Sequence, residues 1–318
     1  MRTPKRISDI LNRKQEFINA NRDKLEKSVI KIQDKFLSQL LSEIIPDLEI
    51  ENGLIKDSTH NYRILSGLDR VYKDFTAVSN ALLIPQITKT ITGINEIGRD
   101  YFKVVMNESM TLRFDKVLQA TINKMSIRIG LKDGKSISGG FLDSVIKDNS
   151  TLTNVKNYVT KSVTGQIDSK EFIKGLSKMV TGDEKMGLME RQYQRYAYDL
   201  YQQYDRAYNT SLAKEFDMRY FLYQGGLIED SRDFCVAHNN KVWSIDEAAD
   251  WDRWMPWMGE YPPGYEIKQK DHYEIPSYLG YPGYQPMTDF GGYNCRHGIG
   301  FIGDDLAFEL RPSLKGSE

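Results

Sequence analysis

The stretch that decides the fold reads D-S-R-D-F-C-V-A-H at residues 230–238 and is completed by G-G-Y-N-C-R-H at residues 291–297. The only two cysteines of the chain, Cys235 and Cys295, lie in these two segments, 60 residues apart. Each is followed closely by a histidine, His238 or His297, although the whole chain has only four histidines. This clustering of rare residue types predicts that the two segments meet in the folded protein.

The spacings C-x2-H and C-x-H supply the donor atoms that a tetrahedral zinc site requires. Zinc in structural sites takes four cysteine or histidine ligands, usually as two short-range pairs. The sequence therefore predicts a structural zinc ion held by Cys235, His238, Cys295 and His297. Two alternatives stay open: a disulfide between the cysteines, or two buried thiols beside unrelated histidines. A reducing cytoplasm favours metal over disulfide.

Composition indicates a soluble globular protein. Of its 318 residues, 40% are hydrophobic and 27% are charged, and the net charge is −1. This balance provides for a core and excludes both a disordered chain and one that attracts nucleic acid by its net charge. No stretch approaches the roughly 18 apolar residues of a membrane span. The N-terminus lacks the apolar core of a secretory signal, so we expect the protein to stay where it is made.

Hydrophobic periodicity predicts a helical first half. Apolar residues between positions 7 and 40 recur every three, four or seven residues, which indicates one long amphipathic helix ended by Pro46. A second helix is expected from residue 62 until it breaks near Pro85, and a third from residue 94 towards residue 125. We interpret the apolar stripes as core packing between helices, with a coiled-coil contact to another subunit as the alternative.

The second half changes from helical to alternating periodicity. After a loop at residues 130–140, shorter helices are expected at 152–164 and from 169, and a helix rich in tyrosine and arginine from 184 to about 216. Strands are expected at 219–224, 241–244 and 298–303, and Ser244 with Glu247 forms a capping box. Residues 256–286 contain six prolines. Because such a segment cannot hold regular structure for long, we expect a cross-link between its ends to hold it.

These patterns predict an α+β fold in which a mainly helical body precedes a small, loop-rich domain that contains β-strands. The expected divisions are a helical body at 1–182, a connecting helix and strand at 183–225, a small α+β domain with the Cys/His group at 226–306, and a polar tail at 307–318.

Together these residues resemble the minor head proteins of tailed bacteriophages, the Mu F-like and related minor capsid proteins. The resemblance covers about residues 185–303 and is carried by R-A-Y-N at 206–209, D-x-R-x-x-C-x-x-H at 230–238, N-K-V-W-S at 240–244 and N-C-R-H at 294–297. The closing N-C-R-H is the most specific of these motifs. Many relatives have His-Pro just before it, where this chain has G-G-Y, and some have cysteine where His238 and His297 stand, an exchange that zinc accepts.

The resemblance implies a structural protein of the virion head, near the portal or inside the capsid shell, that acts in head assembly and in genome packaging or delivery. The implied partners are the portal and major capsid proteins, and the implied location is the virion head after assembly in the host cytoplasm. The basic N-terminal helix has ten basic and five acidic residues up to position 35. We interpret it as a solvated face, and the tyrosines of the later helix as interface residues. Contact of either helix with packaged DNA is the alternative.

Five residues beside the predicted ligands are candidates for supporting roles. The carboxylates can accept hydrogen bonds from histidine N–H groups, and the arginines can bind a carboxylate or a main-chain carbonyl. Turn and surface positions are the alternative interpretation. These candidates are Asp230, Arg232, Asp233, Asn294 and Arg296.

Two other functional classes compete with a structural protein. A metal-dependent hydrolase or nuclease would use His238 or His272, with Glu274 as the general base. However, no H-E-x-x-H motif exists, and four protein ligands would leave zinc without an open position. A nucleic-acid-binding module would use the basic and tyrosine-rich helices, and its binding would depend steeply on salt. We therefore predict a protein that is not an enzyme.

Overall fold

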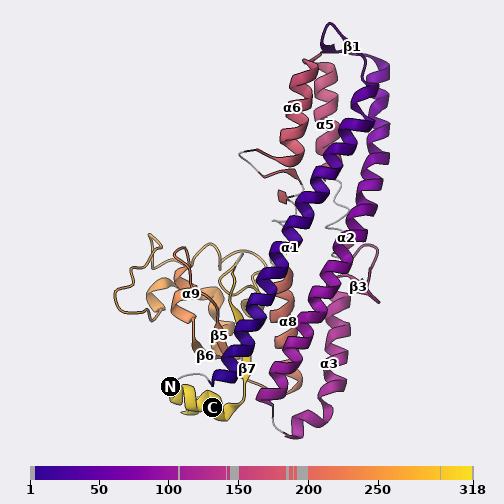
Figure 1. The fold of residues 1–318 in the computed structure, drawn as a ribbon. Coiled ribbons are helices and arrows are strands. Elements are labelled where there is room, and N and C mark those ends of the chain that lie inside the picture. The colour runs from indigo at the N-terminus through magenta and orange to yellow at the C-terminus, as the bar shows by residue number, and fades with distance from the viewer. Residues whose placement is uncertain are drawn as a thin grey trace. The chain divides into compact units, whose positions relative to one another are not determined.

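The computed structural model describes residues 4–106, 108–140, 142–143, 150–183, 186–188, 190–191, 200–293 and 295–316. Long helices come first along the chain, and a small sheet with short helices comes last (Figure 1). The predicted α+β class, with a helical N-terminal body and small strands in the C-terminal region, is confirmed.

The chain forms two compact units. The sheet-containing unit comprises residues 1–21, 90–127 and 199–318, and the helical unit comprises residues 22–89 and 128–198. Helices α1 (Lys5–Glu43) and α2 (Thr59–Val105) each contribute residues to both units. The predicted divisions followed the order of the chain, whereas each unit combines segments that are distant in sequence.

Helix α1 confirms the first predicted helix. Within the helical unit its buried residues repeat at helical spacing, which is the pattern of an amphipathic helix packed on a core. The helix ends at Glu43, directly before a 3-10 turn at Ile45–Asp47 that contains Pro46. The buried residues of this stripe are Leu25, Val29, Ile32, Phe36 and Leu40.

Helix α2 shows that the predicted break at Pro85 was wrong, because the helix is continuous from Thr59 to Val105. A proline inside a helix removes one hydrogen bond and costs about 3 kcal/mol. The buried side chains of Leu83, Ile84 and Ile87 continue the apolar stripe across the proline, so packing offsets that loss. The third predicted helix is divided between the end of α2 and α3 (Glu108–Arg128).

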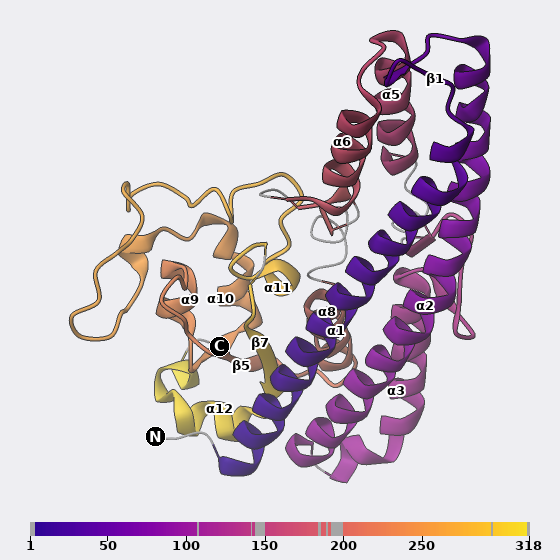
Figure 2. The same ribbon diagram turned by 45° about the horizontal axis from the view of Figure 1, so that its top comes forward.

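The helical unit is completed by two short hairpins and a helix pair. Strands β1 (Ile50–Glu51) and β2 (Leu54–Ile55) pair, as do β3 (Leu131–Lys132) and β4 (Lys135–Ser136) where a loop was expected. Helices α5 (Ser150–Thr164) and α6 (Ser169–Thr181) follow as predicted and lie side by side (Figure 2). The rings of Tyr158 and Phe172 stack between them at 5.5 Å.

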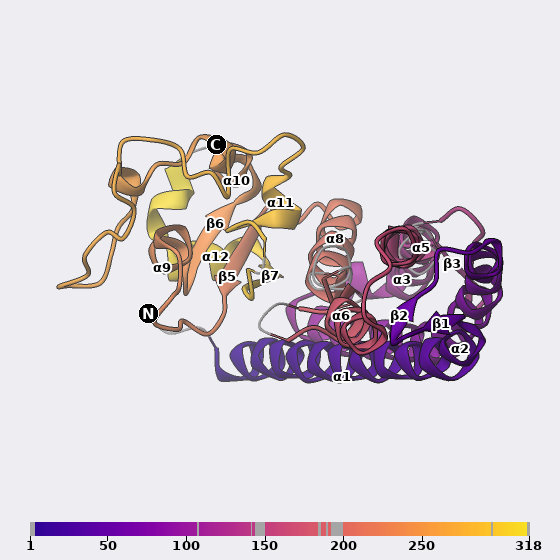
Figure 3. The ribbon, with the colours of Figure 1, turned by 90° about the horizontal axis from the view of Figure 1, so that it is seen from above.

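A three-stranded antiparallel sheet organises the other unit, in the order β6-β5-β7 (Figure 3). The central strand β5 (Tyr220–Gln224) pairs with β6 (Lys241–Ser244) and with β7 (Gly298–Ile302). All three strands were predicted. Helix α8 (Leu200–Glu215) packs on β7 and corresponds to the end of the predicted tyrosine-rich helix. At the expected start of that helix, Met186 forms a β-bridge with Gly182, residues 188, 190 and 191 are helical, and residues 184–185, 189 and 192–199 lie outside the described residues.

Short helices surround this sheet. Helix α9 (Asp233–His238) precedes β6, and α10 (Ile245–Ala249) begins with the predicted capping box of Ser244 and Glu247. The 3-10 turns Trp251–Arg253 and Pro256–Met258 follow. Residues 259–285 then form an extended loop without helix or strand, as expected, up to α11 (Pro286–Asp289).

The segment predicted as a polar tail is packed against the sheet-containing unit. It contains most of α12 (Asp304–Leu310), which contacts β5, and the 3-10 turn Pro312–Gly316. Its apolar residues Ala307 and Leu314 are buried. Across the part of the chain that the structure describes, no helix has the length and apolar character needed to cross a membrane.

Candidate metal centre

Three of the four predicted zinc ligands converge in the sheet-containing unit. Cys235 lies on α9, and Cys295 and His297 directly precede β7. The two Sγ atoms are 3.9 Å apart, and Nδ1 of His297 is 3.9 Å from Sγ of Cys295. All three side chains are buried, and one donor atom from each lies within 4.8 Å of the others. This group, Cys235, Cys295 and His297, is hereafter called the Cys/His group.

The sulfur atoms are thiols in close contact and do not form a disulfide. Their mutual hydrogen bond, and then burial, raise the pKa of Cys235. Burial also raises the pKa of Cys295, but the hydrogen bond from Cys235 and the positive charge of Arg206 outweigh it, so that this pKa falls well below its usual value. The pair therefore favours one thiolate, the form that binds metals.

Close packing of the two signature segments depends on glycine. A Cβ atom at Gly291 would lie 2.7 Å from Sγ of Cys235, and one at Gly225 would lie 2.7 Å from Cδ2 of His297. Real side chains do not tolerate such contacts, so both positions need a residue without a side chain. A larger residue at position 291 would push against Cys235, and one at position 225 would push against His297.

Arg206 on α8 binds the closing segment through hydrogen bonds to main-chain carbonyls. Its buried guanidinium donates hydrogen bonds to the main-chain carbonyls of Cys295 at 2.5 Å, His297 at 2.8 Å and Thr288 at 2.8 Å. It also lies 4.4 Å from the centre of the Phe290 ring. Within the described residues no carboxylate lies at ion-pair distance from it. One cation therefore positions both ligands of the closing signature and places positive charge beside Cys295.

Tyr223, in the middle of the central strand, contacts the same group. Its hydroxyl lies 3.7 Å from Sγ of Cys235 and 3.6 Å from Sγ of Cys295. Its ring stacks on His297 at 4.9 Å. Burial raises the pKa of Tyr223 well above its usual value, and the neighbouring sulfur atoms raise it further. The neutral hydroxyl donates its single proton to one sulfur atom at a time.

His238, the fourth predicted ligand, is not one of the three residues that form the Cys/His group. Its Nδ1 is 2.7 Å from the carbonyl oxygen of Phe234, and its ring stacks on Phe234 at 3.9 Å. The indoles of Trp243 and Trp251 lie 4.6 Å and 4.9 Å from it. Burial lowers the pKa of His238 to about 3, so this histidine is a neutral member of an aromatic cluster.

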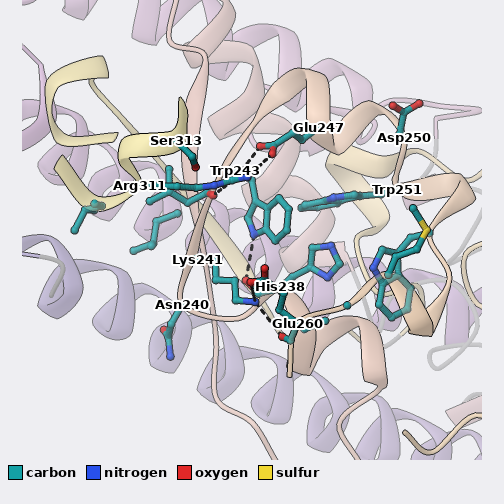
Figure 4. Close-up of a pocket in the computed structure, with 17 residues that line it drawn as sticks. His238, Asn240, Lys241, Trp243, Glu247, Asp250, Trp251, Glu260, Arg311 and Ser313 are labelled. Atoms are coloured by element: carbon teal, nitrogen blue, oxygen red, sulfur yellow. Dashed lines mark hydrogen bonds and ion pairs between the residues drawn. The ribbon is translucent and has the colours of Figure 1, made fainter. Parts of the chain in front are cut away.

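His238 instead faces a pocket of about 690 Å³ (Figure 4). Trp243, Trp251 and Trp254 line one part of it, and two ion pairs lie at its rim. Glu247 accepts hydrogen bonds from Arg311 at 2.6 Å and 2.9 Å, and Lys241 lies 3.3 Å from a carboxylate oxygen of Glu260. No member of the Cys/His group lines this pocket. His272, the other catalytic candidate, is half-buried in the extended loop beside Tyr273.

The supporting residues predicted from sequence have different roles. Arg232 donates to the carbonyl of Gly291 at 2.7 Å and so joins the opening and closing segments. Asp233 accepts from Tyr265, Lys268 and Gln269, which anchors the extended loop, and it does not contact a histidine in these hydrogen bonds. Asp230 is exposed, and Arg296 is half-buried. Asn294 lies outside the described residues.

Further buried polar contacts join α8 to the long helices of the same unit. Lys14 on α1 forms an ion pair with Asp205 at 3.0 Å, and Tyr204 donates to Asn95 on α2 at 2.9 Å. The described tyrosines of α8, at 201, 204 and 208, are all buried. They pack inside this chain, whereas the sequence was interpreted as placing them at a protein interface with their hydroxyls towards water.

Sequence reasoning missed Tyr223 and the role of Arg206. A tyrosine in a strand is an ordinary core residue, and Arg206 was noted only within a resemblance motif. Nothing in the spacing distinguishes Arg206, which is buried, from Arg191 in the same Tyr/Arg-rich run, which is exposed.

No protein-family model, curated protein or solved structure matches this chain. Its function is therefore argued from its residues and from the geometry of the Cys/His group.

Proposed function

We propose that this chain is a minor head protein of a tailed bacteriophage, and that a structural zinc ion bound by the Cys/His group closes its sheet-containing unit. The protein would act in head assembly and in genome packaging or delivery, next to the portal or the major capsid protein. In this role it is a structural component and has no catalytic activity.

One observation carries the proposal: the two halves of the signature, 60 residues apart, meet in a single buried group. The sulfur atoms of Cys235 and Cys295 are 3.9 Å apart, and Arg232 bridges to the closing segment at Gly291. These are the segments whose residues resemble the phage minor head proteins. The contact between the two segments explains why both would be needed in one protein. The opening segment supplies Cys235, and the closing segment supplies Cys295 and His297.

The chemistry of the group fits zinc in a structural role. Thiolate and imidazole are the donors that zinc prefers, and structural zinc sites are closed to substrate. The group is buried, and the pocket of Figure 4 is lined by other residues. Zinc binding would join the two ends of the loop-rich segment, so that part of the binding free energy becomes folding free energy.

The zinc part of the proposal is tested by elemental analysis of the purified protein. We expect about one zinc per chain, lost in Cys235→Ser and in His297→Ala and retained in His272→Ala, which removes a histidine of the extended loop. Loss of zinc in these two variants should lower the stability of the sheet-containing unit, because part of the free energy of metal binding stabilises the fold. A wild-type protein that is folded without metal would contradict the zinc assignment.

The virion part is tested in the phage that encodes the chain. We expect mass spectrometry of purified particles to find the protein in heads, at low copy number relative to the major capsid protein. Deletion of the gene should reduce the yield of infectious particles, and expression in trans should restore it. Absence of the protein from purified heads, with normal particle yield after deletion, would refute the head assignment independently of the metal result.

A further inference from the structure

The Cys/His group is one ligand short of a structural zinc site. Cys235, Cys295 and His297 supply three donors, whereas structural zinc takes four. The hydroxyl of Tyr223 is a further oxygen at this group, 3.7 Å and 3.6 Å from the two sulfur atoms. Among the described residues, this hydroxyl forms its hydrogen bonds with the same two sulfur atoms.

Four of the six separations between these donor atoms lie close to the edges of a metal-centred tetrahedron, and a ring nitrogen of His297 lies within 4.8 Å of the Cys235 sulfur. Ligand atoms about 2.0–2.3 Å from zinc lie about 3.3–3.8 Å from one another. The two sulfur atoms are 3.9 Å apart, the Tyr223 oxygen is 3.6–3.7 Å from each, and Nδ1 of His297 is 3.9 Å from the Cys295 sulfur. We propose that Tyr223, and not His238, is the fourth ligand of the metal, an inference that rests on the zinc site proposed above.

Packing holds Tyr223 in this place. It lies in the central strand, opposite Lys241 on one side and Ile299 on the other. Its ring stacks on His297 at 4.9 Å, and the rings of Phe290 and Trp251 meet it edge-on at 5.3 Å and 5.7 Å. The hydroxyl therefore reaches the sulfur atoms without rearrangement, as a preorganised ligand should.

His238 would have to leave a packed position in order to bind the metal. Its ring is held between Phe234 and Trp243, at 3.9 Å and 4.6 Å, and its Nδ1 bonds to the carbonyl of Phe234. Bringing it to the Cys/His group would break that hydrogen bond and empty a space among three indoles. Such a space lined by apolar groups is unfavourable.

The balance of charge also favours a tyrosine ligand. Zinc with two thiolates and one imidazole is neutral, and a phenolate makes the centre singly negative. That charge offsets the buried guanidinium of Arg206, which has main-chain carbonyls as its partners. A second imidazole would leave the centre neutral and the buried cation without a counter-charge, which is unfavourable in the interior.

The binding step is a simple exchange of protons for metal. Zn²⁺ accepts a lone pair from each sulfur, from the imidazole nitrogen and from the phenol oxygen. The protons of the thiols and of the phenol pass to solvent water, and no atom is oxidised or reduced. Metal binding drives this proton release because the cation replaces the protons at the same atoms.

The experiment compares the full-length wild type with Tyr223→Phe and His238→Gln. Tyr223→Phe removes one oxygen and keeps the ring, and His238→Gln removes the imidazole and keeps a hydrogen-bond donor. Zinc affinity is measured by chelator competition, and the coordination by the visible spectrum of the Co²⁺-loaded protein. An ultraviolet difference spectrum on zinc addition reports any tyrosine that loses its proton. This measurement can be made on the wild type alone, so it does not depend on whether a variant folds.

We expect a tyrosinate band on zinc binding to wild type and to His238→Gln, and none in Tyr223→Phe. The zinc affinity of Tyr223→Phe should fall by about tenfold or more, with a changed Co²⁺ spectrum, while His238→Gln stays close to wild type. A wild type that binds one zinc without a tyrosinate band, and whose Co²⁺ spectrum changes only in His238→Gln, would overturn the Tyr223 assignment and leave the zinc site intact. A wild type that binds no metal would overturn both.

Discussion

Acidification is expected to destabilise the sheet-containing unit through His238. Burial among aromatic rings lowers the pKa of this histidine to about 3, against 6.5 in an unfolded chain. Between these values the unfolded chain binds a proton that the folded protein does not, so stability is complete above pH 6.5 and is lost as the pH falls towards 3. From pH 7 to pH 5 the calculated loss from this one group is about 2 kcal/mol.

The assay is urea unfolding at pH 7 and pH 5, followed by tryptophan fluorescence. All four tryptophans lie between residues 243 and 257, so the signal reports the unit that contains His238. The control is His238→Gln, which does not titrate. The difference between the two proteins cancels every group they share, the metal ligands included.

Wild type should lose about 2 kcal/mol more than His238→Gln between the two pH values. An equal loss in both proteins would mean that His238 is free to take up a proton in the folded state. That result would refute its placement in the aromatic cluster.

Two further predictions concern buried cations of the same unit, and both use the same fluorescence assay. Arg206→Met leaves three main-chain carbonyls of the closing segment without their charged donor, at about 1.5–3 kcal/mol each, so we expect a loss of about 4 kcal/mol or more and only partial recovery in Arg206→Lys. A loss near 1 kcal/mol would show that this arginine does not anchor the segment. Lys14→Met leaves the carboxylate of Asp205 buried and unpaired, which should cost about 3–5 kcal/mol. The double variant Lys14→Met/Asp205→Leu should recover most of that loss, and failure to recover would argue against a direct ion pair.

The parts of the fold that depend on local sequence were predictable. The central strand is a short aromatic run closed by Gly225 and Gly226, and the capping box follows from the spacing of Ser244 and Glu247. The contact between Cys235 and Cys295 was predictable for a different reason. They are the only two cysteines of the chain, and each has a histidine within three residues of it. Both kinds of signal are present in the residues themselves.

The parts that depend on tertiary packing were not predictable from one sequence. Spacing three residues from Cys235 places His238 within one turn of the helix, but it does not tell which neighbours the ring will meet. The imidazole ring contacts Phe234, which lies one helical turn earlier, and the indoles of Trp243 and Trp251. Likewise, Pro85 predicts a helix break only where packing does not continue across it.

The positions of Cys295 and His297 depend on contacts with α8 and the sheet. Arg206 binds the carbonyls on both sides of the closing signature, and its neighbours on the same helix, Asp205 and Tyr204, bind Lys14 and Asn95 on the long helices. Strand β7 begins directly after His297, pairs with the strand of Tyr223, and accepts a hydrogen bond from Tyr101 at Phe301. Residues 259–285 are tied to this framework by Asp233, by Lys241 at Glu260 and by Lys268 at the carbonyls of Glu229 and Ser231, and none of these residues belongs to the Cys/His group. The loop can therefore carry prolines and exposed aromatic side chains without disturbing the site, because the residues that hold the ligands lie elsewhere.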